Sequence, residues 1–208
     1  MSREKQLLKI IKFLINNYSF KDVIDIGCGE ATYVDKFVKN DINYTGVDIT
    51  LSRTPKELIS RKNVNLIEEN ILKYKNIKKF DCVFSCHSIE HFPNTEFFLK
   101  SFFAHIKEFG VFCLIWPPPK DNIVSGHVHC FSMGLMLYNL VRLGIDCRNV
   151  KMIECGYNLA ILGSYKLFKL PKLTHNEGDI GRLSKYFPFE AYQGFDGKNI
   201  PEILKIRV

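Results

Sequence analysis

The chain has 208 residues, a formal net charge of +7, 46% hydrophobic residues and 25% charged residues. This length suffices for one domain with a sizeable core, and the composition excludes a disordered or fibrous chain. No apolar run approaches the ~20 residues of a membrane span, and the N-terminus is charged, unlike the apolar core of a signal peptide. We therefore expect a cytoplasmic protein that does not enter a membrane.

The lysines and cysteines are both dispersed along the chain. Because the lysines form no dense basic tract, we interpret the charge as a solvated surface that can also attract phosphate-bearing partners. The seven cysteines have no paired CxxC spacing, so we expect buried free thiols in a reducing compartment.

Strand-like and helical segments alternate through the first part of the chain. Apolar spacing, β-branched runs and turn residues predict the following elements in order: a helix over 4–17, strands over 22–27 and 43–48 with a helix over 31–39 between them, a short helix opened by the capping box Thr54-Pro55-Lys56-Glu57, strands over 64–67 and 80–85, a helix over 94–107 that Gly110 ends, and a strand over 111–116.

The second part begins with Pro117-Pro118-Pro119, which stops both strand and helix, and continues as a polar loop over 120–131. Ser132 caps a further helix that Gly144 ends, and Gly156-Tyr157 joins strands over 150–155 and 158–167 into a hairpin. Together the elements predict an α/β fold with a mostly parallel sheet of about seven strands and a terminal antiparallel hairpin.

The most informative motif is the strand that breaks at Gly27 and Gly29, followed by a second strand that ends at Asp48. Glycines let the backbone approach a ligand closely, and a carboxylate at a strand end can accept both hydroxyls of a ribose. The motif therefore predicts a site for an adenosine-type cofactor.

Two departures argue against a dinucleotide. The third glycine of G-x-G-x-x-G is Thr32, and Asp25 would repel a pyrophosphate but suits the amine and sulfonium of S-adenosylmethionine. The string D-x-G-x-G-x-A and the strand ending in Asp48 resemble the first two motifs of class I S-adenosylmethionine-dependent methyltransferases. Within that class, they are most similar to the families called methyltransferase type 11 and type 12.

The resemblance covers about residues 20–167 and implies a Rossmann-like methyltransferase domain over 1–167, with an extension over 168–208. It also implies a set of residues that bind S-adenosylmethionine: Asp25, Gly27, Cys28, Gly29, Asp48, Ile49, Asn70, Ile71 and Ser85.

A second motif, H-x-x-E-H, follows the strand over 80–85. On a helix, His87, Glu90 and His91 would share one face and could bind a divalent metal. The motif resembles the E-x-x-E-H metal motif of methyltransferases that modify the 2′-hydroxyl of small RNAs, in which a later histidine completes the site. By its spacing to Phe131, His129 fits that later position. This nitrogen-rich set of His87, Glu90, His91 and His129 favours manganese, iron or zinc over magnesium.

The alternative to a metal is a pocket in which His91 or His129 acts as a base near neutral pH. In both interpretations His91 and His129 are the candidate catalytic residues. We interpret His127 as a polar loop residue that points away from them.

The acceptor is expected to be a hydroxyl. Amide and adenine N-methylation usually use an N/D-P-P-Y/F turn after the fourth strand, and this chain has Ser85-Cys86-His87 there. We expect O-methylation of a small polar or anionic molecule: a sugar, a nucleotide-linked intermediate or a phosphorylated metabolite. An RNA end and a non-catalytic partner subunit are the alternatives, and the protein is expected to be a monomer or homodimer.

The segment 168–208 is rich in aromatic residues, with Arg182 and Lys185 nearby. We interpret it as an extension without a further helix that either closes on an anionic acceptor or docks on the core or on a second subunit. Its aromatic residues are Phe168, Tyr186, Phe187, Phe189, Tyr192 and Phe195.

Overall fold

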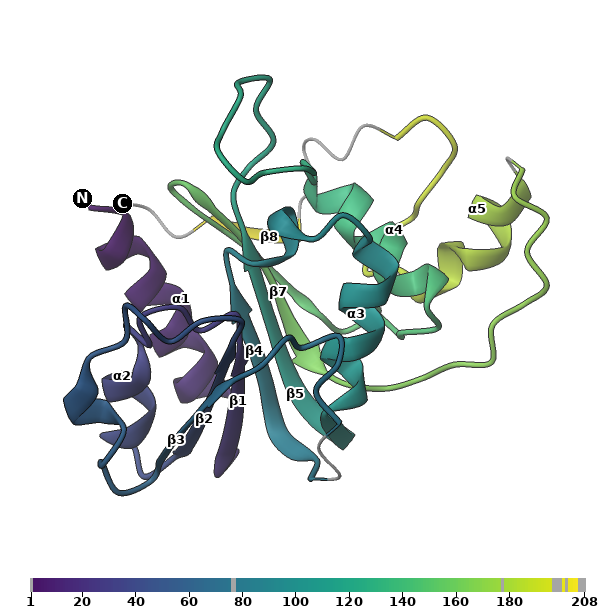
Figure 1. Ribbon diagram of the computed structural model, residues 1–208. Helices are drawn as coiled ribbons and strands as arrows, with labels where there is room; N and C mark the ends of the chain where they lie inside the picture. Colours follow the sequence, from purple (N-terminus) through teal and green to yellow (C-terminus); the bar gives the residue numbers. More distant parts are fainter. Residues whose placement is uncertain (1, 76–77, 177, 196–199, 201, 206–208) are drawn as a thin grey trace.

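The computed structural model describes residues 2–75, 78–176, 178–195, 200 and 202–205. Within these residues, one eight-stranded sheet has the order β3-β2-β1-β4-β5-β7-β6-β8 (Figure 1). The strands are β1 (Asp22–Ile26), β2 (Asn43–Asp48), β3 (Val64–Glu68), β4 (Phe80–Cys86), β5 (Ile106–Trp116), β6 (Lys151–Cys155), β7 (Asn158–Ser164) and β8 (Ile203–Lys205).

The strands from β3 to β5 run parallel, and β7 is antiparallel to both β5 and β6. The Rossmann-like α/β fold with a closing hairpin is thereby confirmed. Strand β8 extends the expected seven strands by pairing parallel with β6.

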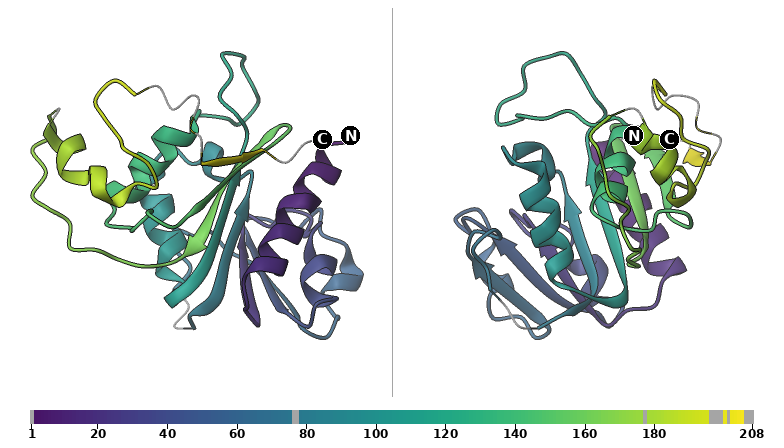
Figure 2. Two further views of the ribbon diagram at one scale, coloured as in Figure 1. Left: turned by 180° about the vertical axis from the view of Figure 1, so that it is seen from behind. Right: turned by 90° about the vertical axis from the view of Figure 1, so that its right-hand side faces the viewer.

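Helices cover both faces of the sheet (Figure 2). Helices α1 (Arg3–Asn17) and α2 (Val34–Val38) pack on the face that carries Val23 and Phe84, and α3 (Thr95–Ala104) and α4 (Met133–Arg142) pack on the face of Ile24 and Val83. This two-sided burial explains the continuous apolar runs of β1, β4 and β5. None of the described helices combines the length and apolarity needed to cross a membrane.

Three local predictions differ from the structure. Gly110 does not end α3, which stops at Ala104; it lies inside β5, where the register with β4 shifts and Tyr165 N–H donates to its carbonyl. Thr54 caps no helix, because its hydroxyl donates to Gly29 O, and a 3-10 turn, Lys56–Leu58, follows. Helix α2 begins at Val34 instead of residue 31, because Ala31 has a positive φ of 52°.

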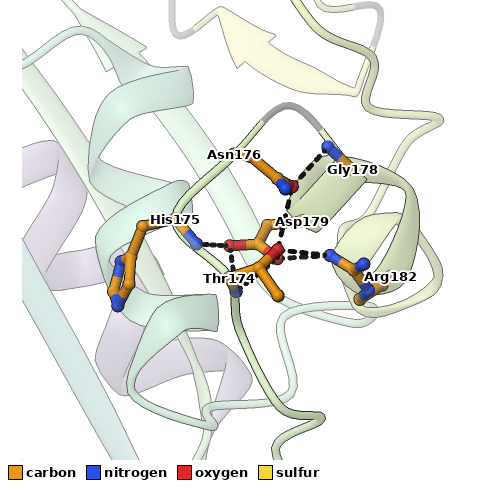
Figure 3. Close-up of polar contacts among 6 residues, drawn as sticks. All are labelled: Thr174, His175, Asn176, Gly178, Asp179 and Arg182. Carbon is orange, nitrogen blue, oxygen red and sulfur yellow. Dashed lines mark hydrogen bonds and ion pairs between the residues drawn. The ribbon is translucent and has the colours of Figure 1, made fainter.

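The segment after residue 167 also differs from the prediction, because it contains a helix, α5 (Gly178–Leu183), as well as β8. Asp179 anchors the start of α5 by accepting hydrogen bonds from Thr174 N–H, His175 N–H and Arg182 Nη1 (Figure 3). Leu183, Phe187 and Ile200 belong to the larger core cluster, so this segment docks on the same molecule. The division into 1–167 and 168–208 stays a prediction.

Candidate active site

A cavity of about 910 Å³ lies at the carboxyl ends of β1 to β4, where parallel α/β sheets bind their ligands. The cavity reaches from the end of β2 and the loop after β3, past the glycine turn after β1, to the loop after β4. The N-terminal part of α1 contributes Glu4 and Leu7 to its wall. Most of the predicted cofactor residues line it: Gly27, Cys28, Gly29, Asp48, Ile49, Asn70 and Ile71.

The glycine turn is held by the protein itself. The N–H groups of Gly27 and Cys28 donate to Val47 O, at 2.8 and 3.3 Å. Gly27 has φ 76°, and a Cβ there would lie 2.0 Å from Ser88 Oγ, so the loop after β4 leaves no room for a side chain. A Cβ on Gly29, at φ 51°, would meet no atom within 4 Å, so this second glycine borders open space.

Asp48 connects the turn to the end of β2. Its Oδ2 accepts from Gly29 N–H at 2.8 Å, and its Oδ1 accepts from Thr50 N–H at 3.2 Å. The next side chain, Ile49, is 68% exposed and offers an apolar surface at the cavity rim. Asn70 Oδ1 accepts from Leu72 N–H at 2.9 Å, so Asn70 shapes the loop after β3.

Asp25 and Ser85 do not line the cavity, in contrast to the sequence-based assignment. Asp25 is buried and accepts a 2.6 Å hydrogen bond from Tyr44 Oη. Burial raises the pKa of the Asp25 carboxyl to about 7, the Tyr44 bond opposes this rise and the charge of Asp48 adds to it. Ser85 is fully buried and its hydroxyl donates to Ile26 O at 2.8 Å, which ties β4 to β1.

The H-x-x-E-H motif does not form a regular helix. His87 has φ 54°, and only a 3-10 turn, Ile89–His91, follows it. Within the part of the chain that the structure describes, the group with metal-ligand geometry is Glu90, His91 and His127, whose ligand atoms lie within 4.8 Å of one another. His87 is not in this group, because its ring binds Glu90 Oε1 on one side and Asn158 on the other.

The sequence predicted that His129 joins the metal-binding group and that His127 points away from it, and the structure has the reverse arrangement. His127 Nε2 lies 4.0 Å from Glu90 Oε1, whereas His129 Nε2 donates to Pro93 O at 3.0 Å. The prediction assumed an extended segment, but Val128 N–H and His129 N–H both donate to Glu90 O, so the chain turns there. Alternation would in any case place residues 127 and 129 on the same face of an extended segment, so it is the turn over Glu90 O that separates the two rings.

A second cavity, of about 230 Å³, lies beside this group. Glu90, His127 and Tyr157 line it together with the loop after β5, and Trp116, Pro117 and Phe131 supply apolar wall. Lys120 belongs to the same lining, with its Nζ 4.4 Å from the centre of the Tyr157 ring. Sequence reasoning missed Lys120 and Tyr157, because Lys120 lies in an irregular loop and Tyr157 in a hairpin turn, and neither segment carries a motif.

A sequence model of the family described as methyltransferase domain matches residues 2–122, which is more than half of the chain. The chain belongs to this methyltransferase-domain family, and the resemblance to class I methyltransferases is confirmed. The ubiquinone biosynthesis O-methyltransferase of Rickettsia typhi is 27% identical over 113 residues, which is 52% of this chain and 46% of that protein. The chain thus spans about half the length of the curated relatives it matches.

Solved structures of methyltransferases share the fold. The 1,6-didemethyltoxoflavin-N1-methyltransferase of Burkholderia thailandensis, with bound 1,6-didemethyltoxoflavin and S-adenosylhomocysteine, has a TM-score of 0.64 at 15% identity, covering 80% of this chain and 78% of that one. The glycopeptide N-methyltransferase MtfA with bound S-adenosylmethionine has a TM-score of 0.62 at 12% identity, covering 77% of this chain and 87% of that one.

The raised pKa of Asp25 predicts a pH dependence of stability. The carboxyl holds its proton more tightly in the folded chain, with a pKa of about 7, than in the unfolded chain, whose pKa is near the ordinary 3.8. The contribution of Asp25 to the free energy of unfolding is therefore full below about pH 4 and is lost as the pH rises to about 7. Asp25→Asn, which keeps an acceptor for Tyr44, should become more stable relative to the wild type over this interval. Urea unfolding of both proteins between pH 4 and pH 7 measures the difference in their free energies of unfolding. A difference that does not change with pH would contradict the raised pKa of Asp25.

Proposed function

We propose that the chain is an S-adenosylmethionine-dependent methyltransferase that transfers a methyl group to an oxygen of a small polar acceptor. The observation that carries the proposal is one cavity, at the carboxyl edge of the sheet, that joins Asp48 to His87 and His91. The printed name of the Rickettsia relative, an O-methyltransferase, supports the choice of oxygen.

The cavity has a chemically suitable place for each half of S-adenosylmethionine. Its volume lies within the range of about 300–1,000 Å³ that is typical of small-molecule sites. Each carboxylate oxygen of Asp48 has a lone pair beyond its bond to the backbone N–H of Gly29 or Thr50, so Asp48 can accept the ribose hydroxyls. The adenine would cover Ile49 beside Asn70, and the methionine would pass the glycine turn toward His87.

The second cavity is the proposed seat of the acceptor. In methylation of a hydroxyl, the acceptor oxygen forms a bond to the methyl carbon while the S–CH₃ bond breaks and S-adenosylhomocysteine leaves. The O–H bond breaks as well, so the site needs a group that takes the proton. His91 and His127 can take it, and the carboxylate of Glu90, which is 1% exposed, holds the cluster in place. A cavity of about 230 Å³ admits a group of the size of one sugar or one aromatic ring, with Lys120 able to meet an anionic substituent.

Glu90, His91 and His127 also fit a divalent metal ion. His91 Nδ1 donates to Gly126 O at 2.8 Å, which leaves the Nε2 lone pair for an ion, as is usual for metal-binding histidines. Glu90 Oε2 is buried and, among the described residues, has no hydrogen-bond partner. Two imidazoles and a carboxylate favour manganese, iron or zinc. Such an ion would lower the pKa of the acceptor hydroxyl.

The assignment of Asp48 predicts a defined loss of affinity. Removal of a hydrogen bond to a charged group costs roughly 1.5–3 kcal/mol, so Asp48→Ala should weaken the binding of S-adenosylhomocysteine by roughly 10- to 150-fold. Titration calorimetry measures both proteins. Glu57→Ala, an exposed acid outside the cavity, is the matched control. Equal affinities for wild type and Asp48→Ala would overturn the cofactor site.

The acceptor atom can be identified by isotope labelling. We expect the protein, given S-adenosylmethionine with a ¹³C-methyl group and pooled hydroxylated metabolites, to yield labelled O-methyl groups in the NMR spectrum. Sugars, sugar phosphates and catechols would form the pool, with a short single-stranded RNA as a separate arm. Labelled N-methyl groups would contradict O-methylation. Label on the RNA alone, with binding that weakens steeply with salt, would favour the RNA alternative.

The different positions of His127 and His129 predict that their alanine variants differ in metal binding and in turnover. His127→Ala should weaken manganese or zinc binding by roughly 10- to 100-fold and lower turnover, because it removes one of three grouped ligands. His129→Ala should change both much less, because its ring contacts a backbone carbonyl. Calorimetry with each metal on chelator-treated protein gives the affinity. A larger effect of His129→Ala would restore the ligand set predicted from the sequence, and a wild type that binds no ion and turns over in chelator would leave the histidines as bases.

A further inference from the structure

A row of buried polar side chains connects α1 to the candidate active site. Asn158, at the start of β7, is fully buried, and its Nδ2 donates to Gln6 Oε1 at 3.3 Å and to Cys155 O at 3.0 Å. Its Oδ1 faces His87 Nε2 at 2.8 Å, and His87 Nδ1 faces Glu90 Oε1 at 3.2 Å. Asn158 lines neither cavity, so its side chain reaches the site only through His87.

The contacts of Asn158 determine where His87 carries a proton. Two acceptors surround the amide nitrogen of Asn158, so the amide oxygen is the atom that faces His87. An amide oxygen can only accept, and His87 Nε2–H must therefore donate to it. Without Asn158, the neutral ring would place its proton on Nδ1, where it would donate to the Glu90 carboxylate. Asn158 thus keeps a proton on Nε2, which the contact with Glu90 alone would not require.

The backbone of His87 is also held in an unusual conformation. A φ of 54° is costly for a residue with a side chain and persists where the surroundings fix it. His87 N–H donates to Ile115 O at 2.9 Å, which anchors the backbone, and Asn158 anchors the ring. His87 lines the larger cavity, and its partner Glu90 lines the smaller one. His87 therefore lies between the proposed sites of the cofactor and of the acceptor.

We propose that Asn158 is a positioning residue of the methyl-transfer site. It fixes the orientation of the His87 ring by accepting a hydrogen bond from Nε2–H, and this orientation places Nδ1 3.2 Å from Glu90 Oε1, beside the group formed by Glu90, His91 and His127. The catalytic consequence rests on the proposed function, whereas the tautomer of His87 does not.

Gln6 and Gly156 support this arrangement from the hairpin side. Gln6 Oε1 accepts from Tyr157 N–H at 3.0 Å as well as from Asn158. Gly156 has φ 58°, and a Cβ there would lie 2.2 Å from the Gln6 side chain. The glycine is therefore the residue that lets α1 reach the hairpin.

The test uses the ¹⁵N resonances of His87 in the full chain. The wild type should show a protonated Nε2, and Asn158→Ala should show an unprotonated Nε2 with the proton on Nδ1. Asn158→Asp is the matched variant, because it loses the same donor contacts but keeps an acceptor for His87. Both variants should lower the thermal midpoint, but only Asn158→Ala should change the tautomer. An unchanged tautomer in folded Asn158→Ala would overturn the proposal.

Kinetic measurements test the catalytic role of Asn158 separately from the proposed methyltransferase function on which that role rests. Once an acceptor has been identified, Asn158→Ala should lower kcat at least 10-fold. The affinity for S-adenosylhomocysteine should change less than about 3-fold, because Asn158 lies outside the larger cavity. The loss should not add to that of His87→Ala in the double variant. A changed tautomer with unchanged kcat would overturn the positioning role. Absence of cofactor binding by the wild type would instead overturn the proposed function and leave the tautomer result intact.

Discussion

The reversal of strand order beside β1 is the constraint on which the site depends. Strand β1 pairs with β2 on one side and with β4 on the other, so the loops that leave β1 and β4 diverge and open a cleft between them. Ser88 closes the base of that cleft by donating to Ile26 O and Gly27 O, each at 3.3 Å. The first glycine of the turn is therefore required by a protein contact, and the larger cavity owes its shape to two loops that hold each other.

The two cavities differ in how far they are shared with the family. The larger cavity is lined by residues between Glu4 and Pro93, all within the matched range 2–122. The smaller one takes His127, Cys130 and Tyr157 from beyond that range. The part that the family has in common is thus the proposed cofactor side. Selectivity for an acceptor would reside in the loop after β5 and in the β6–β7 turn, which lie largely beyond the matched range.

The sequence predicted the strands and the glycine turn because their signals are local: β-branched runs, glycines and an acid at a strand end. Local signals failed where distant groups intervene. Thr54 bonds to the glycine turn instead of capping a helix, and Gly110 serves a register shift between β4 and β5. The choice between His127 and His129 depends on how the loop after β5 turns over Glu90 O, which no residue pattern of the loop itself encodes. Asp25 looked like a ligand group because its partner, Tyr44, lies on another strand.

The contact between Gln6 and Asn158 joins residues 152 positions apart. Closing so long a loop is slow and comes late in folding, whereas the strands that carry the glycine turn and Asp48 pair between near neighbours in the sequence. In a chain synthesised from its N-terminus, every residue that lines the larger cavity therefore leaves the ribosome before the hairpin that contacts His87.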